Sequence, residues 1–580
     1  MSCGNLCTLY KENLSKHLFL ISFITLWVYF VCLYPTLFRE VFAEQGSNYL
    51  FYAYNKTFAQ NVWKDDAGYL VWLPRVIALL VSAIASPYWF ILITNLIAQG
   101  FLAFFVSFFN HRGFRGILPD HLRFLISLIF GMIILPNYEL FTYVNFVYTG
   151  FIFIGFLLFL NKENLRGGGA EYLFYCVLCA LLCISKFHFV VFYPIFIACM
   201  IYHGCRKERR SLFFYIPSLI TISIQLVYVA LITGQAGALS YTVYNNTGIL
   251  GRIIPALRGV FLWLTAYSTN FRFLGYAFFS LTAAAVLFSF LAYFAFKYYK
   301  SGMICARVFY LFIVFNLISI MFGCVTALSH FTGISEVAFK NIPFFFGRRW
   351  SVSYNMVWLA VVILLFNFIL IPQNKGKKCT KIYAGILGVF LILSLLTTYP
   401  KIFKEGQYIT KGNRISLSDW AKLHVLLKNE KYYIPLDPFP HGLYAASFNK
   451  GISVGQISEN IYASQKAFTK NMTEVPDYDQ ESFTENGDLS TEDLFQNGQK
   501  IMALIAAYPK NESIYALALD AQNRVLARSY LLSSTRTMYK YLLFDQSVSA
   551  AKIRFLNQDD EPVGTEITLA AVYIEHQEEN

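Results

Sequence analysis

The chain has 580 residues, of which 57% are hydrophobic and only 14% are charged. A soluble domain carries about a quarter charged residues, so this composition argues against an ordinary water-soluble protein and indicates a membrane protein. The net charge is +13, yet residues 401–580 hold 18 Lys/Arg against 23 Asp/Glu, so the positive excess lies before them. Such a distribution is typical of basic cytoplasmic loops and does not indicate a nucleic-acid-binding surface.

Apolar stretches of the length that crosses a bilayer as a helix recur along the first 400 residues and not after them. We predict crossings near 18–35, 70–86, 88–110, 143–160, 212–233, 273–296, 305–327, 350–371 and 382–399. Shorter candidates are 121–136, 171–185 and 187–204, with an interfacial or re-entrant piece near 257–270. The expected fold is a polytopic α-helical membrane protein with about 11–13 transmembrane helices.

Basic loops predict the orientation of these crossings. The loops Cys205–Arg210, Lys297–Lys300 and Lys375–Lys378 are rich in Lys and Arg, as cytoplasmic loops are. The first crossing follows two lysines and has no small-residue cleavage site, so we expect it to be retained with a cytoplasmic N-terminus. Counting from Lys378, the last crossing would deliver residues 401–580 to the outer face.

One loop conflicts with this orientation. Two full crossings between Tyr69 and Asn110 would place the basic loop His111–Arg115 on the outer face. Either one of the two segments crosses only half of the membrane, or this loop departs from the positive-inside rule.

The first outer loop, residues 39–68, contains the first candidate site. Its stretch 49–62 suits a helix lying in the membrane interface, and Asp65 and Asp66 follow just before the next crossing. Partial desolvation there would raise the pKa of a carboxylate towards the range of a general base. Alternatively, the two aspartates only end the loop and favour the start of a helix.

Arginines close to the outer face form the second candidate site. Arg75 follows Pro74 inside a crossing, where it either extends to the interface or binds a phosphate. The outer loop Ser329–Trp350 gathers further ionisable residues, namely His330, Glu336, Lys340, Arg348 and Arg349. Two adjacent arginines favour an anionic head group, although Arg beside Trp also anchors a helix at an interface.

Three more ionisable residues, Glu139, Lys186 and His188, interrupt apolar stretches and either line a cavity or lie in surface loops. No nucleotide-binding glycine motif accompanies them, so ATP-driven transport has no support. The cysteines at 176, 179 and 183 lie in an apolar run. We expect them to be small buried side chains and not metal ligands. We expect no cofactor, and the need for a metal stays undecided.

The polar sequence of residues 401–580 predicts a soluble domain with an initial helix at 418–428. Strand-forming runs at 514–519, 525–532 and 565–575 surround turns at 520–523 and 557–560, which indicates a small β-sandwich or α+β domain. No cysteine follows Cys379, so a disulfide framework is excluded there.

Three stretches resemble the GT-C superfamily of membrane glycosyltransferases. Asp66–Leu80 (DAGYLVWLPRVIALL) is similar to an acidic loop end followed by a Pro-Arg crossing. Phe346–Asn355 (FGRRWSVSYN) resembles an Arg-aromatic segment, and Tyr433–Pro440 (YIPLDPFP) resembles a stretch of the outer domain. More narrowly, the chain resembles bacterial and phage O-antigen-modifying glucosyltransferases of the serotype-conversion type.

This resemblance implies a donor, an acceptor and a place. A polyprenyl-phosphate sugar in the bacterial inner membrane would be the donor, and lipopolysaccharide or another surface glycan would be the acceptor on the periplasmic face. Asp66, or Asp65, would deprotonate the acceptor hydroxyl, while Arg349, with Arg348, Lys340 and Arg75, would bind the phosphate. The alternatives are a glycan flippase or permease, an O-antigen polymerase, and a structural membrane protein that only binds glycan.

Overall fold

The computed structural model describes most of the first 233 residues and parts of the remainder. The described residues are 3–34, 45–66, 68–85, 87–162, 165, 169–233, 260, 263–264, 277–329, 351–370, 385, 388–389, 431–435, 442–448, 451–456, 488–490, 500–507, 514–531, 539–564 and 567–575. Two compact units divide the chain. The helical unit comprises residues 1–34, 62–77 and 95–405, and the second unit comprises 35–61, 78–94 and 406–580.

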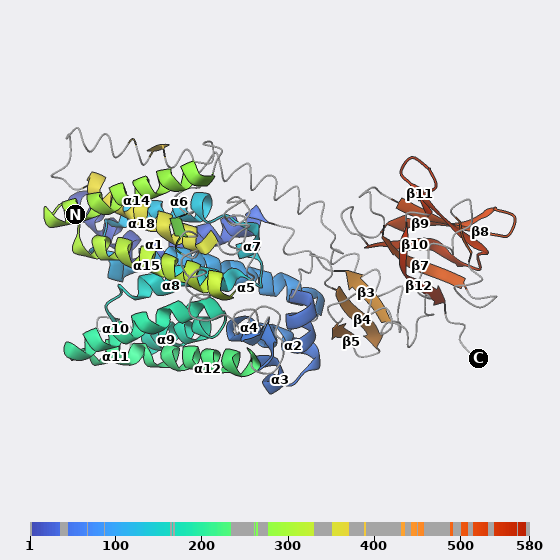
Figure 1. Cartoon of the computed structure of the whole chain (residues 1–580), viewed down its shortest axis with the longest axis horizontal. Coiled ribbons are helices and arrows are strands. Elements are labelled where there is room, and N and C mark those ends of the chain that lie inside the picture. Colours follow the sequence, from blue (N-terminus) through green and yellow to red (C-terminus); the bar gives the residue numbers. More distant parts are fainter. Residues whose placement is uncertain are drawn as a thin grey trace. The chain divides into compact units, whose positions relative to one another are not determined.

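Helices dominate the chain before residue 371 (Figure 1). The α-helices are α1 (Cys3–Leu33), α2 (Phe51–Asn55), α3 (Phe58–Val62), α4 (Trp72–Ser82), α5 (Pro87–Ser107), α6 (Asp120–Ile129), α7 (Tyr138–Phe141), α8 (Gly150–Leu157), α9 (Gly169–Cys183), α10 (Phe192–Cys205), α11 (Arg209–Phe214), α12 (Ile216–Thr233), α14 (Ala277–Lys300), α15 (Ala306–Ser329) and α18 (Val352–Leu370). Short 3₁₀ and π segments extend several of them, namely η2 (Gln45–Leu50), η3 (Phe108–Asn110), η4 (Arg112–Phe114), η5 (Phe130–Ile134), η6 (Phe146–Thr149) and η8 (Phe187–Val191).

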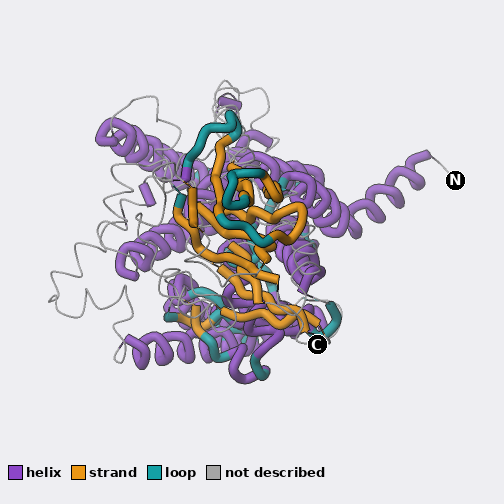
Figure 2. The backbone as a smooth tube through the Cα atoms, turned by 90° about the vertical axis from the view of Figure 1, so that its right-hand side faces the viewer, coloured by secondary structure: helices purple, strands orange, loops and turns teal. Residues whose placement is uncertain are grey.

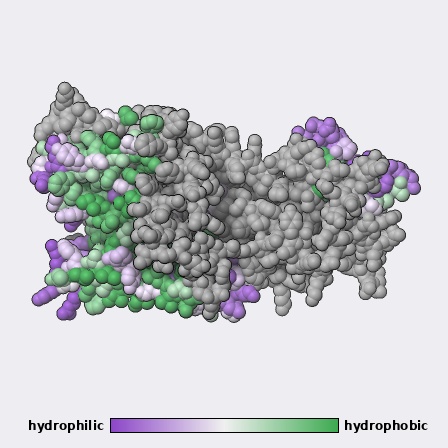
Figure 3. Space-filling view, viewed as in Figure 1, coloured by the Kyte–Doolittle hydropathy of each residue, from purple (hydrophilic) through white to green (hydrophobic). Residues whose placement is uncertain are grey.

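Five of the described helical stretches are long and apolar enough to cross a membrane. They are Trp89–Phe114, Phe187–Cys205, Arg209–Leu231, Leu281–Lys300 and Ala306–Thr326. Hydrophobic side chains cover much of the visible flank of the helical unit in Figure 3. The expected helical, apolar fold is therefore confirmed in this coarser form, and the number of crossings stays a prediction. The predicted segments 382–399 and 257–270 lie almost wholly outside the described residues.

The segment predicted to cross at 70–86 is shorter than expected. α4 has 11 residues and therefore spans about 16 Å, roughly half of the hydrocarbon core. The helical turns end at Ser82, and α5 begins anew at Pro87, which has no N–H to continue a preceding helix. α4 is therefore shorter than a full crossing, as the half-crossing explanation of the basic loop requires, and the choice between the two explanations stays a prediction.

Contacts at the far end of α5 show which segments lie beside the loop 111–115. Arg112 and His111 each lie 2.9 Å from a carboxylate oxygen of Glu171, which opens α9. The next residue, Tyr172, donates its hydroxyl to the carbonyl of Arg210 at 2.8 Å. The loop 111–115 thus lies with the basic loop 205–210 at one end of the helical unit, hereafter the basic end.

The loop before α15 and the C-terminal part of α18 reach the same end. Asn367 of α18 donates its amide to the carbonyl of Ile117 at 3.2 Å and accepts the N–H of Cys305 at 3.3 Å. Among the described residues, the basic loops at 111–115, 205–210 and 297–305 therefore gather together, as the positive-inside rule expects of one membrane face.

Arg123 holds the 109–120 turn at the basic end. Its side chain is 1% exposed and donates to the carbonyls of Phe109, His111 and Leu118 at 3.0, 2.9 and 3.2 Å. A further N–H pairs with the Asp120 carboxylate. One guanidinium thus donates to three backbone carbonyls and to a carboxylate.

We expect Arg123→Met to destabilise the full-length protein by about 3–5 kcal/mol, because it removes the buried guanidinium that donates to three backbone carbonyls and pairs with Asp120. Arg115→Met is the matched control, since Arg115 approaches the same carboxylate at 3.8 Å with a 47% exposed side chain and should cost under about 1 kcal/mol. Unfolding of the two purified variants in detergent measures the difference. Equal midpoints would contradict the role given to Arg123.

The C-terminal part of the chain forms β-sheet (Figure 2). Its strands are β3 (Lys431–Pro435), β4 (Gly442–Phe448), β5 (Gly451–Gln456), β6 (Asp488–Ser490), β7 (Lys500–Ala507), β8 (Ile514–Leu519), β9 (Val525–Leu531), β10 (Tyr539–Val548), β11 (Lys552–Asn557) and β12 (Thr568–Glu575). Seven of them make one antiparallel sheet in the order β12-β7-β10-β9-β8-β11-β6, and β3-β4-β5 make a second sheet.

The β-rich domain is confirmed, but its form differs from the predicted sandwich. Among the described residues the seven strands are one continuous ladder that curves like a half-barrel around a single core, which takes in Leu504 of β7, Phe544 of β10 and Phe555 of β11. The predicted strands at 514–519, 525–532 and 565–575 correspond to β8, β9 and β12. The predicted helix at 418–428 lies outside the described residues.

Both predicted turns exist. Asp520 accepts the backbone N–H groups of Gln522 and Arg524 at 2.9 and 2.8 Å, and Asn523 takes a left-handed conformation with φ of 63°. The hydrogen bonds from Arg524 hold the pKa of Asp520 below its usual range. The ionised carboxylate therefore stabilises the turn above the ordinary pKa of aspartate, and that contribution falls as the pH drops through the lowered value.

Candidate functional site

The carboxylate pair lies on a two-stranded hairpin, β1 (Asp65–Asp66) and β2 (Tyr69–Leu70), in which Asp65 pairs with Leu70 and Asp66 with Tyr69. Gly68 turns the chain with φ of 85°, a conformation open to glycine at no steric cost. One carboxylate oxygen of Asp65 accepts the Gly68 N–H at 3.2 Å, and the other lies 3.1 Å from the Lys64 ammonium. Asp65 therefore stabilises this carboxylate hairpin (residues 65–70), while Asp66 is the more buried of the pair, 9% exposed.

α12 fixes the hairpin from one side. The amide of Gln225 accepts the N–H of Leu70 at 3.0 Å and donates to its carbonyl at 3.3 Å, much as a neighbouring strand would. One turn further on, the Tyr228 hydroxyl donates to the carbonyl of Trp63 at 3.5 Å. A polar side chain in an apolar helix thus holds the backbone that carries the aspartates.

The first turn of α4 is fixed from two other segments. The Ser185 hydroxyl, just after α9, accepts the N–H of Leu73 at 2.8 Å and so satisfies a free donor of the helix start. The Tyr143 hydroxyl donates to the carbonyl of Pro74. These contacts position Arg75, which is fully buried and donates to the backbone carbonyl of Asp65 at 3.4 Å.

Lys186 brings a second buried cation to the hairpin. It is 1% exposed, and its ammonium donates to the Tyr69 hydroxyl at 3.1 Å. The same ammonium lies 5.2 Å from the centre of the Tyr69 ring and 5.5 Å from that of Tyr148, so two aromatic faces stabilise the charge. Lys186 therefore binds the residue that pairs with Asp66 across the hairpin.

His188 continues this cluster. Its buried ring stacks on Phe322 of α15 at 4.9 Å and meets the Tyr148 ring edge-on at 5.5 Å. Glu139 lies on α7 and is half-buried; its N–H is bound by the Asn137 side chain at 3.0 Å. The structure therefore brings Asp65, Asp66, Arg75, Lys186 and His188 into one region and places Glu139 on a separate segment.

The predicted basic loop lies outside the described residues, so His330, Glu336, Lys340, Arg348 and Arg349 have no described position. The chain is described again from Ser351, whose hydroxyl accepts the Asn137 amide at 3.2 Å, just before α7. The roles predicted for the five ionisable residues of that loop stay predictions.

The structure adds residues that the sequence did not single out. Tyr69, Tyr148, Gln225 and Tyr228 contact the hairpin or its cations. Gln225 was detectable in principle, because a lone amide in an apolar run needs a buried partner. The tyrosines were not, since 40 of them occur along the chain.

The cysteines behave as the sequence predicts. Cys176, Cys179 and Cys183 are free and buried on α9. Within the part of the chain that the structure describes, no group of three or more His, Cys, Asp or Glu side chains is arranged to hold a metal.

Together these features define a helical protein with several helices of membrane-spanning length and a carboxylate hairpin beside two buried cations at the end remote from the basic loops. α9 and α12 both start at the basic end and reach the hairpin through Ser185 and Gln225. No known protein-family model, curated protein or solved structure matches the chain.

Proposed function

We propose that the protein is a membrane glycosyltransferase that moves a sugar from a polyprenyl-phosphate donor to a surface glycan of the O-antigen or lipopolysaccharide type. The single observation that carries this proposal is the hairpin region, where the hairpin that bears Asp65 and Asp66 is contacted by the buried Arg75, at the Asp65 backbone carbonyl, and by the buried Lys186, at the Tyr69 hydroxyl. A glycosyl transfer from a lipid phosphate needs both kinds of group in one place, a base and cations that bind a phosphate.

The proposed reaction is a direct displacement at the anomeric carbon. Asp66 accepts the proton of the acceptor hydroxyl while its oxygen forms the new glycosidic bond. The bond between the anomeric carbon and the phosphate oxygen breaks, and the polyprenyl phosphate leaves with the electron pair. Lys186, Arg75 and the predicted Arg348–Arg349 pair bind that phosphate and stabilise its growing negative charge.

The topology of the helical unit supports an outer-face reaction in the bacterial inner membrane. Basic loops gather at the end remote from the hairpin, and such loops face the cytoplasm. On this reading the N-terminus is cytoplasmic, and the hairpin and residues 401–580 face the periplasm, where finished glycans are modified.

The alternatives differ in what they do with the same lipid. A flippase or permease would move a lipid-linked glycan without breaking a covalent bond, a polymerase would join repeating units, and a purely structural protein would only bind glycan. Membranes that contain the full-length protein are to be incubated with polyprenyl-phosphate sugar, radiolabelled in the sugar, and with acceptor glycan. Label that appears in the glycan supports transfer, whereas label that only crosses the membrane or remains on the lipid contradicts it.

A variant with both Arg348→Ala and Arg349→Ala tests the predicted phosphate contact. We expect the donor KM to rise at least about tenfold, because a lost charge-assisted hydrogen bond costs about 1.5–3 kcal/mol. Arg209→Ala with Arg210→Ala removes a matched adjacent pair at the basic end and should leave the donor KM unchanged. Normal binding of radiolabelled donor by the first variant would show that this pair does not hold the phosphate.

A further inference from the structure

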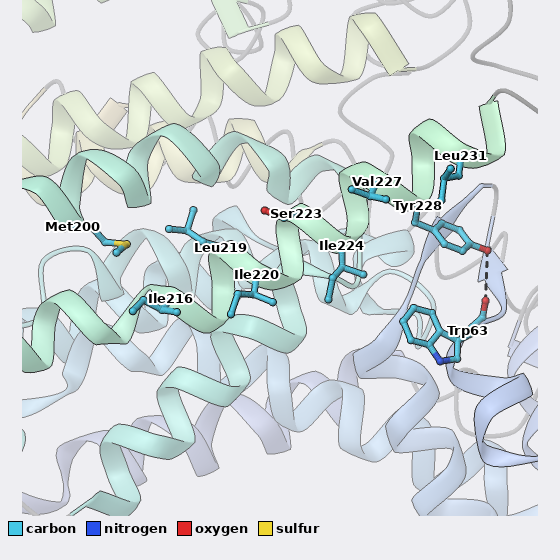
Figure 4. A pocket seen from close by; sticks show the side chains of 10 residues that line it. All are labelled: Trp63, Met200, Ile216, Leu219, Ile220, Ser223, Ile224, Val227, Tyr228 and Leu231. Carbon is cyan, nitrogen blue, oxygen red and sulfur yellow. Dashed lines mark hydrogen bonds between the residues drawn. The ribbon is translucent and has the colours of Figure 1, made fainter.

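An apolar groove runs along α12 towards the carboxylate hairpin (Figure 4). It has a volume of about 620 Å³ and extends from Ile216 and Met200 to Tyr228 and Trp63. Isoleucine, leucine and valine side chains form most of its wall, and Ile220 and Val227 remain 54% and 58% exposed. Such a surface suits a hydrocarbon ligand and offers almost nothing to a polar one.

The groove ends at the candidate site. Trp63 forms its last wall and precedes Asp65 by two residues, and its ring meets the Trp72 ring at the start of α4 edge-on at 5.5 Å. Tyr228 lines the groove, and its hydroxyl donates to the Trp63 carbonyl at 3.5 Å. A ligand in the groove would therefore have its apolar part along α12 and its polar end beside the carboxylates and cations.

The dimensions point to a single chain of a lipid. From Ile216 to Leu231 the helix rises about 22 Å, and a partner helix of that length occupies a cylinder of about 1,700 Å³. The groove holds far less than that, but its length suits one extended hydrocarbon chain. Arg75 and Lys186 contact the hairpin that follows Trp63, and their charge matches a negatively charged head group.

We propose that this groove seats the isoprenoid chain of a polyprenyl phosphate, with the phosphate at the carboxylate hairpin. The choice of an isoprenoid over an acyl chain rests on the proposed function, whereas the groove and its direction rest on the geometry alone. The groove thereby defines where the donor lipid enters, between α10 and α12.

Native mass spectrometry of the full-length protein in detergent tests this with two probes. One is a long-chain polyprenyl phosphate without sugar, and the other is dioleoyl phosphatidic acid, which presents a phosphate on acyl chains. Ile220→Trp fills the groove and should raise the Kd for polyprenyl phosphate at least about tenfold, because the chain loses the burial of two or more methylene groups. Ile201→Trp on α10 is the matched control, since Ile201 is 63% exposed and does not line the groove.

Each outcome decides a different point. If Ile220→Trp binds polyprenyl phosphate as tightly as the unaltered protein does, the groove assignment is overturned. If the unaltered protein binds phosphatidic acid as tightly as polyprenyl phosphate, and Ile220→Trp weakens both to the same extent, the choice of an isoprenoid chain is overturned. If Ile220→Trp fails to fold, Val227→Asn makes the groove polar without added bulk and should show the same loss. If these variants lose polyprenyl-phosphate binding but the unaltered protein transfers no sugar, the groove assignment is supported and the proposed function is rejected.

Discussion

Asp66→Asn is expected to abolish sugar transfer, with a fall in rate of about 10²–10⁴-fold, because an amide of the same shape cannot accept the acceptor's proton. Asp66 is 9% exposed on the carboxylate hairpin, and its strand partner Tyr69 binds Lys186. The backbone pairing of the hairpin does not depend on this carboxylate. The variant should therefore insert and fold, which its amount in membranes and its unfolding midpoint measure.

Asp65→Asn tests whether Asp65 takes part in catalysis or only stabilises the hairpin. Both oxygens of Asp65 are engaged within the hairpin, by the Gly68 N–H and by Lys64. The amide can still accept the Gly68 N–H, so we expect a loss of less than about tenfold, well below that of Asp66→Asn. Unchanged modified glycan in cells that carry both substitutions would reject the base assignment.

Lys186→Met is expected to lower kcat/KM for the lipid donor by about a hundredfold or more. Truncating one partner of a buried charge pair costs about 2–5 kcal/mol, and the ammonium has donors beyond the one that meets Tyr69. Methionine keeps most of the apolar volume between the Tyr69 and Tyr148 rings, so the packing survives while the charge is lost. Steady-state transfer with varied donor measures the effect.

Lys162 provides a matched control at the basic end. It is fully buried, donates to the Tyr215 hydroxyl at 2.6 Å and lies 4.9 Å from the centre of that ring. Lys162→Met removes an equivalent buried ammonium and should lower the stability of the protein without changing kcat/KM for the lipid donor. A similar fall in kcat/KM for both variants would mean that Lys186 acts only through folding.

Local patterns in the sequence predict the helical body and several strands correctly. Hydropathy located α5, α12, α14 and α15 closely, because burial of an apolar helix depends on the composition of the segment alone. β8 and β9 were predicted from a short alternation on either side of a polar turn. β7, by contrast, reads KIMALIAA, a run without alternation that suits a helix and a buried strand equally.

The length of α4 could not be predicted from the same pattern. Its apolar run continues beyond Ser82, but the helix ends there, and Pro87 starts the next one. Hydropathy shows which segments are apolar enough to lie in hydrocarbon, whereas the end of a helix depends on which backbone groups form hydrogen bonds. Beyond Ser82 the backbone forms turns in which the N–H groups of Ile84 and Ala85 both bind the carbonyl of Val81, an arrangement that composition does not reveal.

By itself, the sequence determined the class of the chain, the charge asymmetry of its loops, and the candidacy of Asp65, Asp66, Arg75 and Lys186, because each of these follows from the cost of placing charge in apolar surroundings. Only the tertiary structure decided which of these residues meet. Ser185 lies 112 residues from Leu73 and Gln225 lies 155 from Leu70, yet their hydrogen bonds fix the hairpin and the start of α4. Partners so far apart are chosen by the packing of whole helices, and no local pattern records that choice.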